Sequence, residues 1–228
     1  MDTTNTLSLP FEAVDDLIYD ARAGDLESLQ TDITKFSEEH NCSPADIIKA
    51  AIDAEDESEG GTGSCLLHWP AANGNAEILK YLLSLLKTQK GEKDSSNLQM
   101  INHKNHSGNT PLHWAALNTH LECVKALVEA GADIIMKNNA GHDAVFVAEQ
   151  SDWNATATTE EEGKEEDTAQ AEGEVAEAEA STPRETTKGQ QVVEWLLTCE
   201  KGADMEKSAV EDADADVVMA AGEAGPSK

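Results

Sequence analysis

The amino-acid sequence predicts an all-α solenoid of about four stacked helix pairs, and an internal repeat is the main evidence for this fold class. Gly108 recurs at Gly141, so that one unit spans about 33 residues, a length typical of helical repeat proteins. The segment PLHWAALNTHLE at 111–122 has a counterpart, LLHWPAANGNAE, at 66–77. Because a single helix pair cannot bury its own apolar face, units of this kind are expected to stack.

The unit at 106–139 contains the clearest signals for individual helices. Thr110 and Pro111 are typical of a helix start, since the Thr hydroxyl can accept from free N–H groups and proline suits the first helical position. Apolar residues at helical spacing predict a second helix over 121–129, followed by Gly131, a residue type that tolerates the left-handed helix terminus. The TPLHWAA opening and the AGAD ending of this unit resemble the ankyrin repeat. The resemblance implies an ankyrin-repeat solenoid.

The first and fourth units depart from this pattern. From Phe11 onward, apolar residues at helical spacing precede the segment ARAGDLE at 21–27, which resembles an inter-helix turn, and a second helix is expected over 26–39. A terminal repeat is often atypical because its outer face meets water. The fourth unit begins at Gly141, and the pattern of its second helix returns only near Gln191. We therefore predict a fourth repeat that is split by an insertion.

Three local features predict further detail. Pro70 lies inside the first helix of the second unit, where proline is tolerated only in the first turn, so we expect a tight or distorted helix in an intact repeat. Ser43 and Pro44 form a helix start, which predicts an additional helix over 46–54. A short apolar segment at 98–101 precedes the third unit.

Acidic, low-complexity stretches flank and interrupt the repeats. They contain few large apolar side chains, so burial cannot offset their ordering entropy, and we expect them to be disordered. The predicted organisation is a disordered start at 1–10, ankyrin repeats one to three with the first helix of the fourth at 11–153, an acidic disordered insertion at 154–188, the second helix of the fourth repeat at 189–200, and an acidic disordered tail at 201–228.

The composition limits the kinds of partner and compartment. The 228 residues carry a formal net charge of −29, and the pI is near 4.3. This charge argues against direct binding to nucleic acid or to a membrane and favours a basic protein partner; the alternative is that acidity only keeps a small repeat protein soluble. No apolar run approaches the roughly 18 residues needed to span a bilayer, and the N-terminal sequence lacks the features of a signal peptide. Four cysteines without CxxC spacing predict reduced thiols in the cytosol or nucleus.

Residue types that carry catalysis or bind metals are present but poorly arranged. His68 and His113 occupy equivalent positions of two repeats, and in the ankyrin motif this histidine bridges the turn to the next repeat by hydrogen bonds. A zinc site would need four converging ligands, and neither His-x-x-x-His nor Cys-x-x-Cys spacing occurs. Cys65 and His68 form a conceivable nucleophile pair, but nothing in so acidic a chain favours the thiolate. We therefore expect no catalytic residue, no metal and no cofactor.

A binding surface is better supported than an active site. Stacked repeats form a concave groove from their finger tips and the exposed sides of their first helices. Trp69 and Trp114 are expected one repeat apart there, either as an aromatic strip that anchors a partner or as rings that only fill gaps between neighbouring first helices. The predicted partner-binding residues are Trp69, Ala72, Asn73, His106, Ser107, Asn109, Trp114, Leu117, Asn118, His142, Asp143, Glu149 and Asp20. A basic amphipathic helix would place its apolar side on the tryptophans and its Lys and Arg against the acids.

Four segments carry a narrower resemblance. They are DARAGDL at 20–26, LH at 67–68 with AANG at 71–74, NTPLHWA at 109–115, and NNAGHDA at 138–144. Together they are similar to the dedicated ankyrin chaperones of fungi that bind the KH-domain ribosomal protein in the head of the small (40S) subunit.

The resemblance implies a monomeric, non-enzymatic protein of the cytoplasm and nucleus. It would capture the N-terminal region of the newly made basic client, keep it soluble for nuclear import, accompany it to the nucleus and leave it during small-subunit assembly. Pro70 and the long acidic insertion depart from the pattern. The alternative is a generic ankyrin adaptor or a regulator of transcription or signalling that binds another basic or amphipathic partner.

Overall fold

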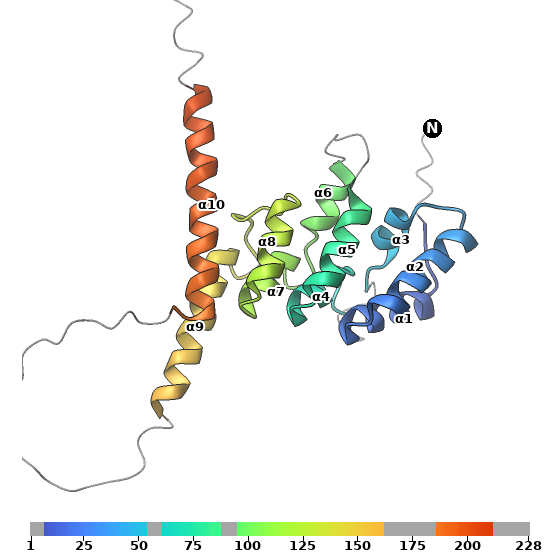
Figure 1. The fold of residues 1–228 in the computed structure, drawn as a ribbon, viewed down its shortest axis with the longest axis horizontal. Helices are drawn as coiled ribbons and strands as arrows, with labels where there is room; N and C mark the ends of the chain where they lie inside the picture. The colour runs from blue at the N-terminus through green and yellow to red at the C-terminus, as the bar shows by residue number, and fades with distance from the viewer. Residues whose placement is uncertain (1–6, 54–60, 88–94, 162–185, 212–228) are drawn as a thin grey trace, which may run out of the picture.

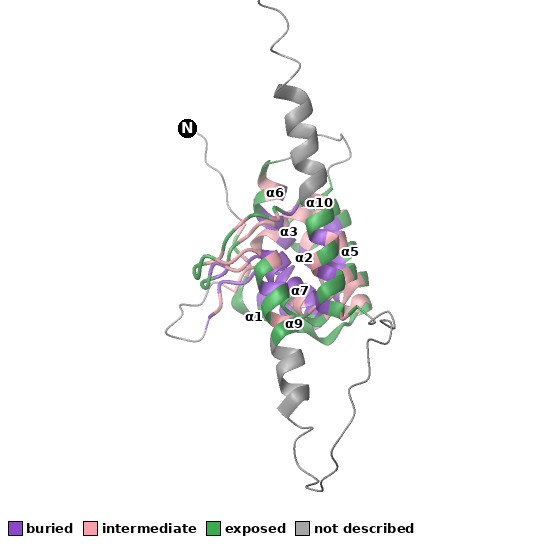
Figure 2. Ribbon diagram, turned by 90° about the vertical axis from the view of Figure 1, so that its left-hand side faces the viewer, coloured by how far each residue is buried: buried purple, intermediate pink, exposed green. Residues whose placement is uncertain are grey.

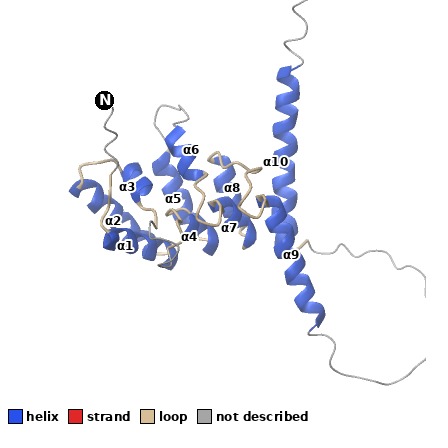
Figure 3. Cartoon of the chain, turned by 180° about the vertical axis from the view of Figure 1, so that it is seen from behind, coloured by secondary structure: helices blue, strands red, loops and turns tan. Residues whose placement is uncertain are grey.

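The computed structural model describes residues 7–53, 61–87, 95–161 and 186–211, and within these ranges the chain forms ten α-helices and one isolated β-bridge. In chain order the helices are α1 (Phe11–Ala23), α2 (Leu26–Glu39), α3 (Pro44–Ala50), α4 (His68–Asn73), α5 (Ala76–Leu86), α6 (Ser95–Ile101), α7 (Pro111–Leu117), α8 (Leu121–Glu129), α9 (Ala144–Glu161) and α10 (Lys188–Glu211). Pairs stand side by side from α1 and α2 at one end of the stack to α9 and α10 at the other (Figure 1). Figure 3 shows the same helices, joined by loops, from behind. The all-α fold class is confirmed.

The helices form two rows. Helix α1 packs on α4, α4 on α7 and α7 on α9, so the first helices of the pairs form one continuous row. In the second row, α5 packs on α8 and α8 on α10. Short helices α3 and α6 follow the first two pairs, and Lys49 Nζ of α3 donates to Ser96 Oγ of α6 at 2.8 Å. Helix α10 packs on α9 and continues the second row after α8. It therefore occupies the position of the second helix of a fourth repeat whose first helix is α9.

A histidine links each regular repeat to the next. In the third repeat, the Thr110 N–H donates to His113 Nδ1 at 3.2 Å, and His113 Nε2 donates to the carbonyl oxygen of His142 at 3.0 Å. His68 repeats this arrangement: its Nδ1 accepts from the N–H three residues earlier, and its Nε2 donates to the Asn109 carbonyl at 3.0 Å. Because one ring nitrogen accepts and the other donates, both rings are neutral. The bridging role expected for these histidines is confirmed.

This arrangement makes stability depend on pH. Burial lowers the pKa of His68 to about 4 from an ordinary value of 6.5. A neutral native histidine contributes its full stability above the unfolded pKa, and that contribution is lost as pH falls from 6.5 towards the native pKa. We expect the free energy of unfolding to fall by about 2 kcal/mol through His68 alone when pH drops from about 7.5 to about 5. Urea unfolding at a series of pH values measures this loss. His68→Gln should flatten the profile, and an equally steep profile in the variant would contradict the assignment.

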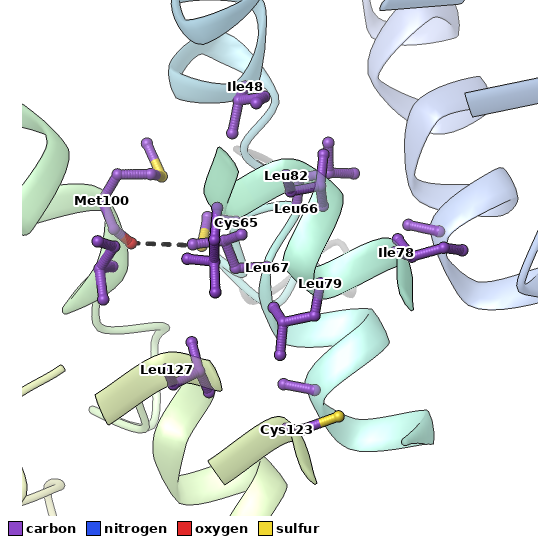
Figure 4. Close-up of a cluster of buried hydrophobic side chains, with 14 of the residues drawn as sticks. Ile48, Cys65, Leu66, Leu67, Ile78, Leu79, Leu82, Met100, Cys123 and Leu127 are labelled. Atoms are coloured by element: carbon purple, nitrogen blue, oxygen red, sulfur yellow. Dashed lines mark hydrogen bonds between the residues drawn. The ribbon is translucent and has the colours of Figure 1, made fainter. Parts of the chain in front are cut away.

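The core runs through the whole stack. Buried residues, purple in Figure 2, occur in helices along the stack, and those that are apolar form one cluster that includes residues of α1 and of α10. In Figure 4, side chains from α3, α5, α6 and α8 gather around the segment Cys65–Leu67 that precedes α4, and the Cys65 Sγ lies 3.9 Å from the carbonyl oxygen of Met100. Helices α3 and α6 therefore complete the core around the start of the second repeat.

Pro70 lies in a short helix and does not disrupt its repeat. Helix α4 begins at His68 and ends at Asn73, so that buried Pro70 lies in its first turn. The N–H that proline lacks would have no partner within the helix at this position. The repeat is intact, as expected from the sequence, since α4 packs on α1, α5 and α7.

The ends of several elements differ from expectation. The helix predicted over 46–54 ends at Ala50, because Ile52 pairs in an antiparallel bridge with Cys65. Helix α9 continues to Glu161 and α10 to Glu211, beyond the limits of 153 and 200 expected from the sequence.

The segments predicted to be disordered are described only in part. In the start of the chain, predicted to be disordered over 1–10, Leu7 and Leu9 pack against the core. The remaining parts of the predicted disordered start, insertion and tail, at 1–6, 162–185 and 212–228, lie outside the described residues, as do 54–60 and 88–94.

Candidate partner-binding site

A pocket of about 610 Å³ lies beside α1, at the N-terminal end of the stack. Its lining residues are Leu7, Ser8, Leu9, Phe11, Val14, Asp15, Ile18, Arg22, Ala50, Ile52, Asp53, Thr62 and Trp69. The chain before α1, helix α1 itself, the segment after α3 and the start of α4 therefore meet at one place. We call this site the N-terminal pocket.

Helix α1 supplies one wall of the N-terminal pocket. Phe11, Asp15, Ile18 and Arg22 recur at helical spacing and so share one face of α1. Phe11 is 62% exposed although its ring is large and apolar. A partner that covered this ring would remove apolar surface from water, at about 25 cal/mol per Å².

Two tryptophans lie between the first helices. The rings of Trp69 and Trp114 meet edge to face, with centroids 5.4 Å apart and an angle of 77° between their planes. The Arg22 guanidinium carbon lies 4.9 Å from the centroid of Trp69. Both rings are half-buried, and the buried Trp69 N–H has no hydrogen-bond acceptor in the described part of the chain. The pair thus fills the space between α4 and α7, and Trp69 in addition lines the N-terminal pocket.

The two carboxylates of the N-terminal pocket differ in environment. Asp53 Oδ2 accepts hydrogen bonds from the N–H and the hydroxyl of Thr62, at 2.7 and 2.6 Å, and so fixes the finger before α4. Asp15 lies exposed on α1. The apolar walls of the pocket could hold an apolar side chain of a partner, and exposed Asp15 at the rim could pair with a Lys or Arg beside it.

The finger-tip residues His106, Ser107 and Asn109 connect repeats to one another. His106 Nδ1 donates to the Gly61 carbonyl at 3.1 Å, and the Ser107 carbonyl accepts from the N–H of Asn139 at 3.1 Å. Asn109 Oδ1 accepts from a side-chain amide of the next finger at 2.9 Å. His106 and Ser107 remain exposed, whereas Asn109 is half-buried. Some of the hydrogen-bonding groups of these residues therefore join neighbouring repeats and are not free to bind a partner.

The predicted residues near the inter-helix turns also make bonds between and within repeats. Asn73 Nδ2 donates to the Arg22 carbonyl at 3.0 Å, and the Ala72 carbonyl accepts from a histidine of the next turn at 3.0 Å. Asn118 Nδ2 donates to the carbonyl of Trp114 at 3.2 Å. Leu117 is 46% exposed at the end of α7. Of this group, Leu117 offers the largest apolar surface to a partner.

At the other end of the stack, the predicted residues surround the start of α9. Asp143 Oδ1 accepts from the N–H of Phe146 at 2.9 Å, which is the capping interaction of a helix N-terminus. His142 stacks on Phe146 with ring centroids 4.1 Å apart. Glu149 lies exposed on α9, and Phe146 is 43% exposed. Phe146 is an exposed aromatic residue that sequence reasoning did not select.

Asp20 is the predicted residue that the structure places elsewhere. It is only 8% exposed and lines a separate pocket between α1 and α2. Two positions along a helix correspond to a rotation of about 200°, so Asp20 and Arg22 project from nearly opposite sides of α1. Burial, with the negative charges of Asp32, Asp25 and Asp16, raises the pKa of Asp20. Sequence reasoning expected Asp20 on or beside the concave surface that carries the tryptophans, and the structure places it in this separate pocket instead.

Sequence reasoning also missed most of the N-terminal pocket. For Phe11, Ile18 and Arg22 the signal was present, because their spacing places them on one helical face. This spacing predicted a helix, and sequence reasoning did not select these residues for binding. For Ile52 no local signal exists, since its position depends on the bridge to Cys65.

The structure brings the conceivable nucleophile pair together: the Cys65 Sγ lies 3.2 Å from His68 Nδ1, and both side chains are buried. Burial raises the pKa of Cys65 to about 12, so its thiol stays protonated and is a poor nucleophile. The part of the chain that the structure describes contains no group of three or more His, Cys, Asp or Glu placed to hold a metal ion. Within the same ranges, no helix combines the length and apolar character needed to cross a bilayer.

Stacked helix pairs, linking histidines and an open pocket define a binding protein of the helical-repeat class. Residues 32–138 match the family model for ankyrin repeats, in three copies. The chain belongs to the ankyrin-repeat family.

Similarity to individual proteins is more specific. The chain is 37% identical over 141 residues to the ankyrin repeat-containing protein YAR1 of Saccharomyces cerevisiae, a match that covers 61% of this chain and 64% of the yeast protein. A chain of the crystal structure of the yeast ribosomal protein Rps3 in complex with its chaperone Yar1 is similar with a TM-score of 0.53 and 32% identity. That match covers 71% of this chain and 99% of the yeast chain.

Other ankyrin proteins match over shorter regions. The probable E3 ubiquitin-protein ligase XBOS32 of rice is 33% identical over 107 residues, which is 39% of this chain and 21% of the ligase. The chain thus spans less than two thirds of the length of YAR1 and about a fifth of the ligase.

Proposed function

We propose that this protein is a non-enzymatic chaperone that holds a basic ribosomal protein of the small subunit before assembly. The yeast relative is described as the chaperone of a ribosomal protein, Rps3, and was crystallised with it. A net charge of −29 suits a basic client, since opposite charges speed encounter and suppress wrong partners. The observation that carries the proposal is the N-terminal pocket, where exposed Phe11 and half-buried Trp69 provide an apolar binding surface.

The pocket fits an amphipathic basic helix, such as one from the N-terminal region of the KH-domain protein. An apolar side chain of the client would enter between Phe11, Ile18 and Trp69, and a neighbouring Lys or Arg would lie against Asp15. Burial of the apolar anchor provides most of the affinity, while rim charges mainly set encounter rate and specificity. The client would stay soluble in the cytoplasm and nucleus until assembly removes it. Binding of this kind requires no reaction step.

Affinity purification from the source cell tests the proposal. We expect one stoichiometric partner, a basic small-subunit ribosomal protein, and a complex that weakens about tenfold between low and moderate salt because rim charges are screened. Binding is measured by titration calorimetry with the purified client at two salt concentrations. A set of several non-basic partners, or a purified ribosomal client that does not bind, would exclude the chaperone function.

A further inference from the structure

A second pocket, of about 400 Å³, lies between α1 and α2. Its lining residues are Asp20, Asp25, Glu27, Ser28, Thr31 and Asp32. Every charged residue among them is acidic. We call this site the acidic pocket.

The turn between the two helices fixes the shape of the acidic pocket. Gly24 has a φ of +82° and ends α1, which allows the chain to reverse at once into α2. Asp25 then caps α2: its Oδ1 accepts from the Ser28 N–H at 3.0 Å and its Oδ2 from the Ser28 hydroxyl at 2.9 Å. These bonds lower the pKa of Asp25 and hold it as a carboxylate. Asp20 projects towards this turn from the last part of α1.

Asp20 is the unusual member of the group. It is more than nine-tenths buried, and its Oδ2 has no hydrogen-bond partner among the described residues. Buried carboxylates are normally paired or hydrogen-bonded, because loss of hydration without compensation costs free energy. Neighbouring negative charges add to this cost, and the pKa of Asp20 is accordingly raised. In the free protein, the unpaired carboxylate of Asp20 therefore lowers the free energy of unfolding. A cationic ligand that paired with this carboxylate would remove that cost.

We propose that the acidic pocket receives one Lys or Arg side chain of the basic client. This inference rests on the proposed function and adds a second contact to it. Helix α1 forms a wall of both pockets, with Ile18 and Arg22 on one side and Asp20 on the other. A client chain that leaves the N-terminal pocket across α1 reaches the acidic pocket at the end of the stack. The contact selects clients with a cationic residue at this point, beyond the general attraction of opposite charges.

The decisive variants are Asp20→Asn and Asp32→Asn, with Glu129→Gln as a control that removes one charge from the exposed surface of α8. We expect each pocket variant to bind the purified client about tenfold more weakly, as for loss of a hydrogen bond to a charged group, and the control to bind within about twofold. The thermal midpoint of Asp20→Asn should equal or exceed that of the wild type, because an amide loses less hydration on burial than a carboxylate. Unchanged affinity in both variants, or a lowered midpoint that accounts for the weaker binding, would overturn the proposal.

A client-independent probe separates this proposal from the chaperone function. L-Argininamide titrated into the full chain should produce saturable amide shifts at Asp20 and Ser28 in the wild type and in Glu129→Gln, but not in Asp20→Asn. Absence of saturation in the wild type overturns the acidic pocket. If argininamide saturates the pocket but no ribosomal client binds, the pocket stands and the chaperone function fails. If client binding requires Phe11 but not Asp20, the chaperone function stands and the proposal for the acidic pocket fails.

Discussion

Replacement of Phe11 by Ala is expected to weaken binding of the ribosomal client by about 30-fold, or about 2 kcal/mol, which is typical of an anchoring residue in an interface. The ring is 62% exposed in the free protein and lines the N-terminal pocket, so a partner that fills the pocket buries it. Since little of the ring is buried in the free protein, the free energy of unfolding should change by less than about 0.5 kcal/mol. Titration calorimetry with the purified client measures the first effect and urea unfolding the second.

Tyr19→Ala provides the matched control. Tyr19 lies on the same helix and is 70% exposed, but it is not among the residues that line the N-terminal pocket. In the repeat alignment it occupies the position of Trp69. Client affinity should therefore be unchanged in Tyr19→Ala. Equal losses in the two variants would mean that binding depends on general aromatic surface and not on the pocket.

Replacement of Leu79 by Ala should reduce the free energy of unfolding by about 3 kcal/mol, within the range measured for large-to-small changes in protein cores. Leu79 has no exposed surface, and it lies in α5 among the side chains gathered around Cys65–Leu67 (Figure 4). Because each repeat contacts only its neighbours, a cavity in the second repeat also weakens the coupling between the two ends of the stack. Urea denaturation monitored by tryptophan fluorescence and by circular dichroism measures both effects.

Leu117→Ala removes the same number of atoms from an exposed position, 46% accessible at the end of α7. Its unfolding free energy should lie within about 0.5 kcal/mol of the wild type. If Leu79→Ala were as mild as Leu117→Ala, the core described between the helix rows would be incorrect.

Local signals were sufficient to predict much of the fold. The limits expected for the helices at 26–39 and 121–129 agree with α2 and α8, because Gly24 and the capping residue Asp25 mark the start of α2 and Gly131 follows α8. The linking role of His68 and His113 followed from the repeat motif and is visible in the hydrogen bonds of both rings. The end of α3 was not predictable from its own sequence, since Ile52 leaves the helical pattern to pair with Cys65, which is distant in the sequence.

The site was harder to predict than the fold. Repeat alignment selects positions within regular units, and it identified Trp69 and Trp114 correctly as neighbours, with rings 5.4 Å apart. It offers no guidance for Phe11, which lies before the segment ARAGDLE at 21–27 that identifies the first unit, and the structure places Phe11 in the lining of the N-terminal pocket. Asp20 illustrates the same difficulty: its charge was evident, but its burial between α1 and α2 depends on how two helices pack.

The central claim is that the N-terminal pocket seats a basic ribosomal protein, and site-specific photo-crosslinking in the source cell tests it most directly. A photoreactive phenylalanine is placed at position 11, within the pocket, or at position 135, where Ile135 is 60% exposed in the loop after α8. Our account predicts one dominant adduct from position 11, with a basic protein of the small ribosomal subunit, and little of it from position 135. An adduct of equal yield from both positions, or none with a ribosomal protein from position 11, would contradict it.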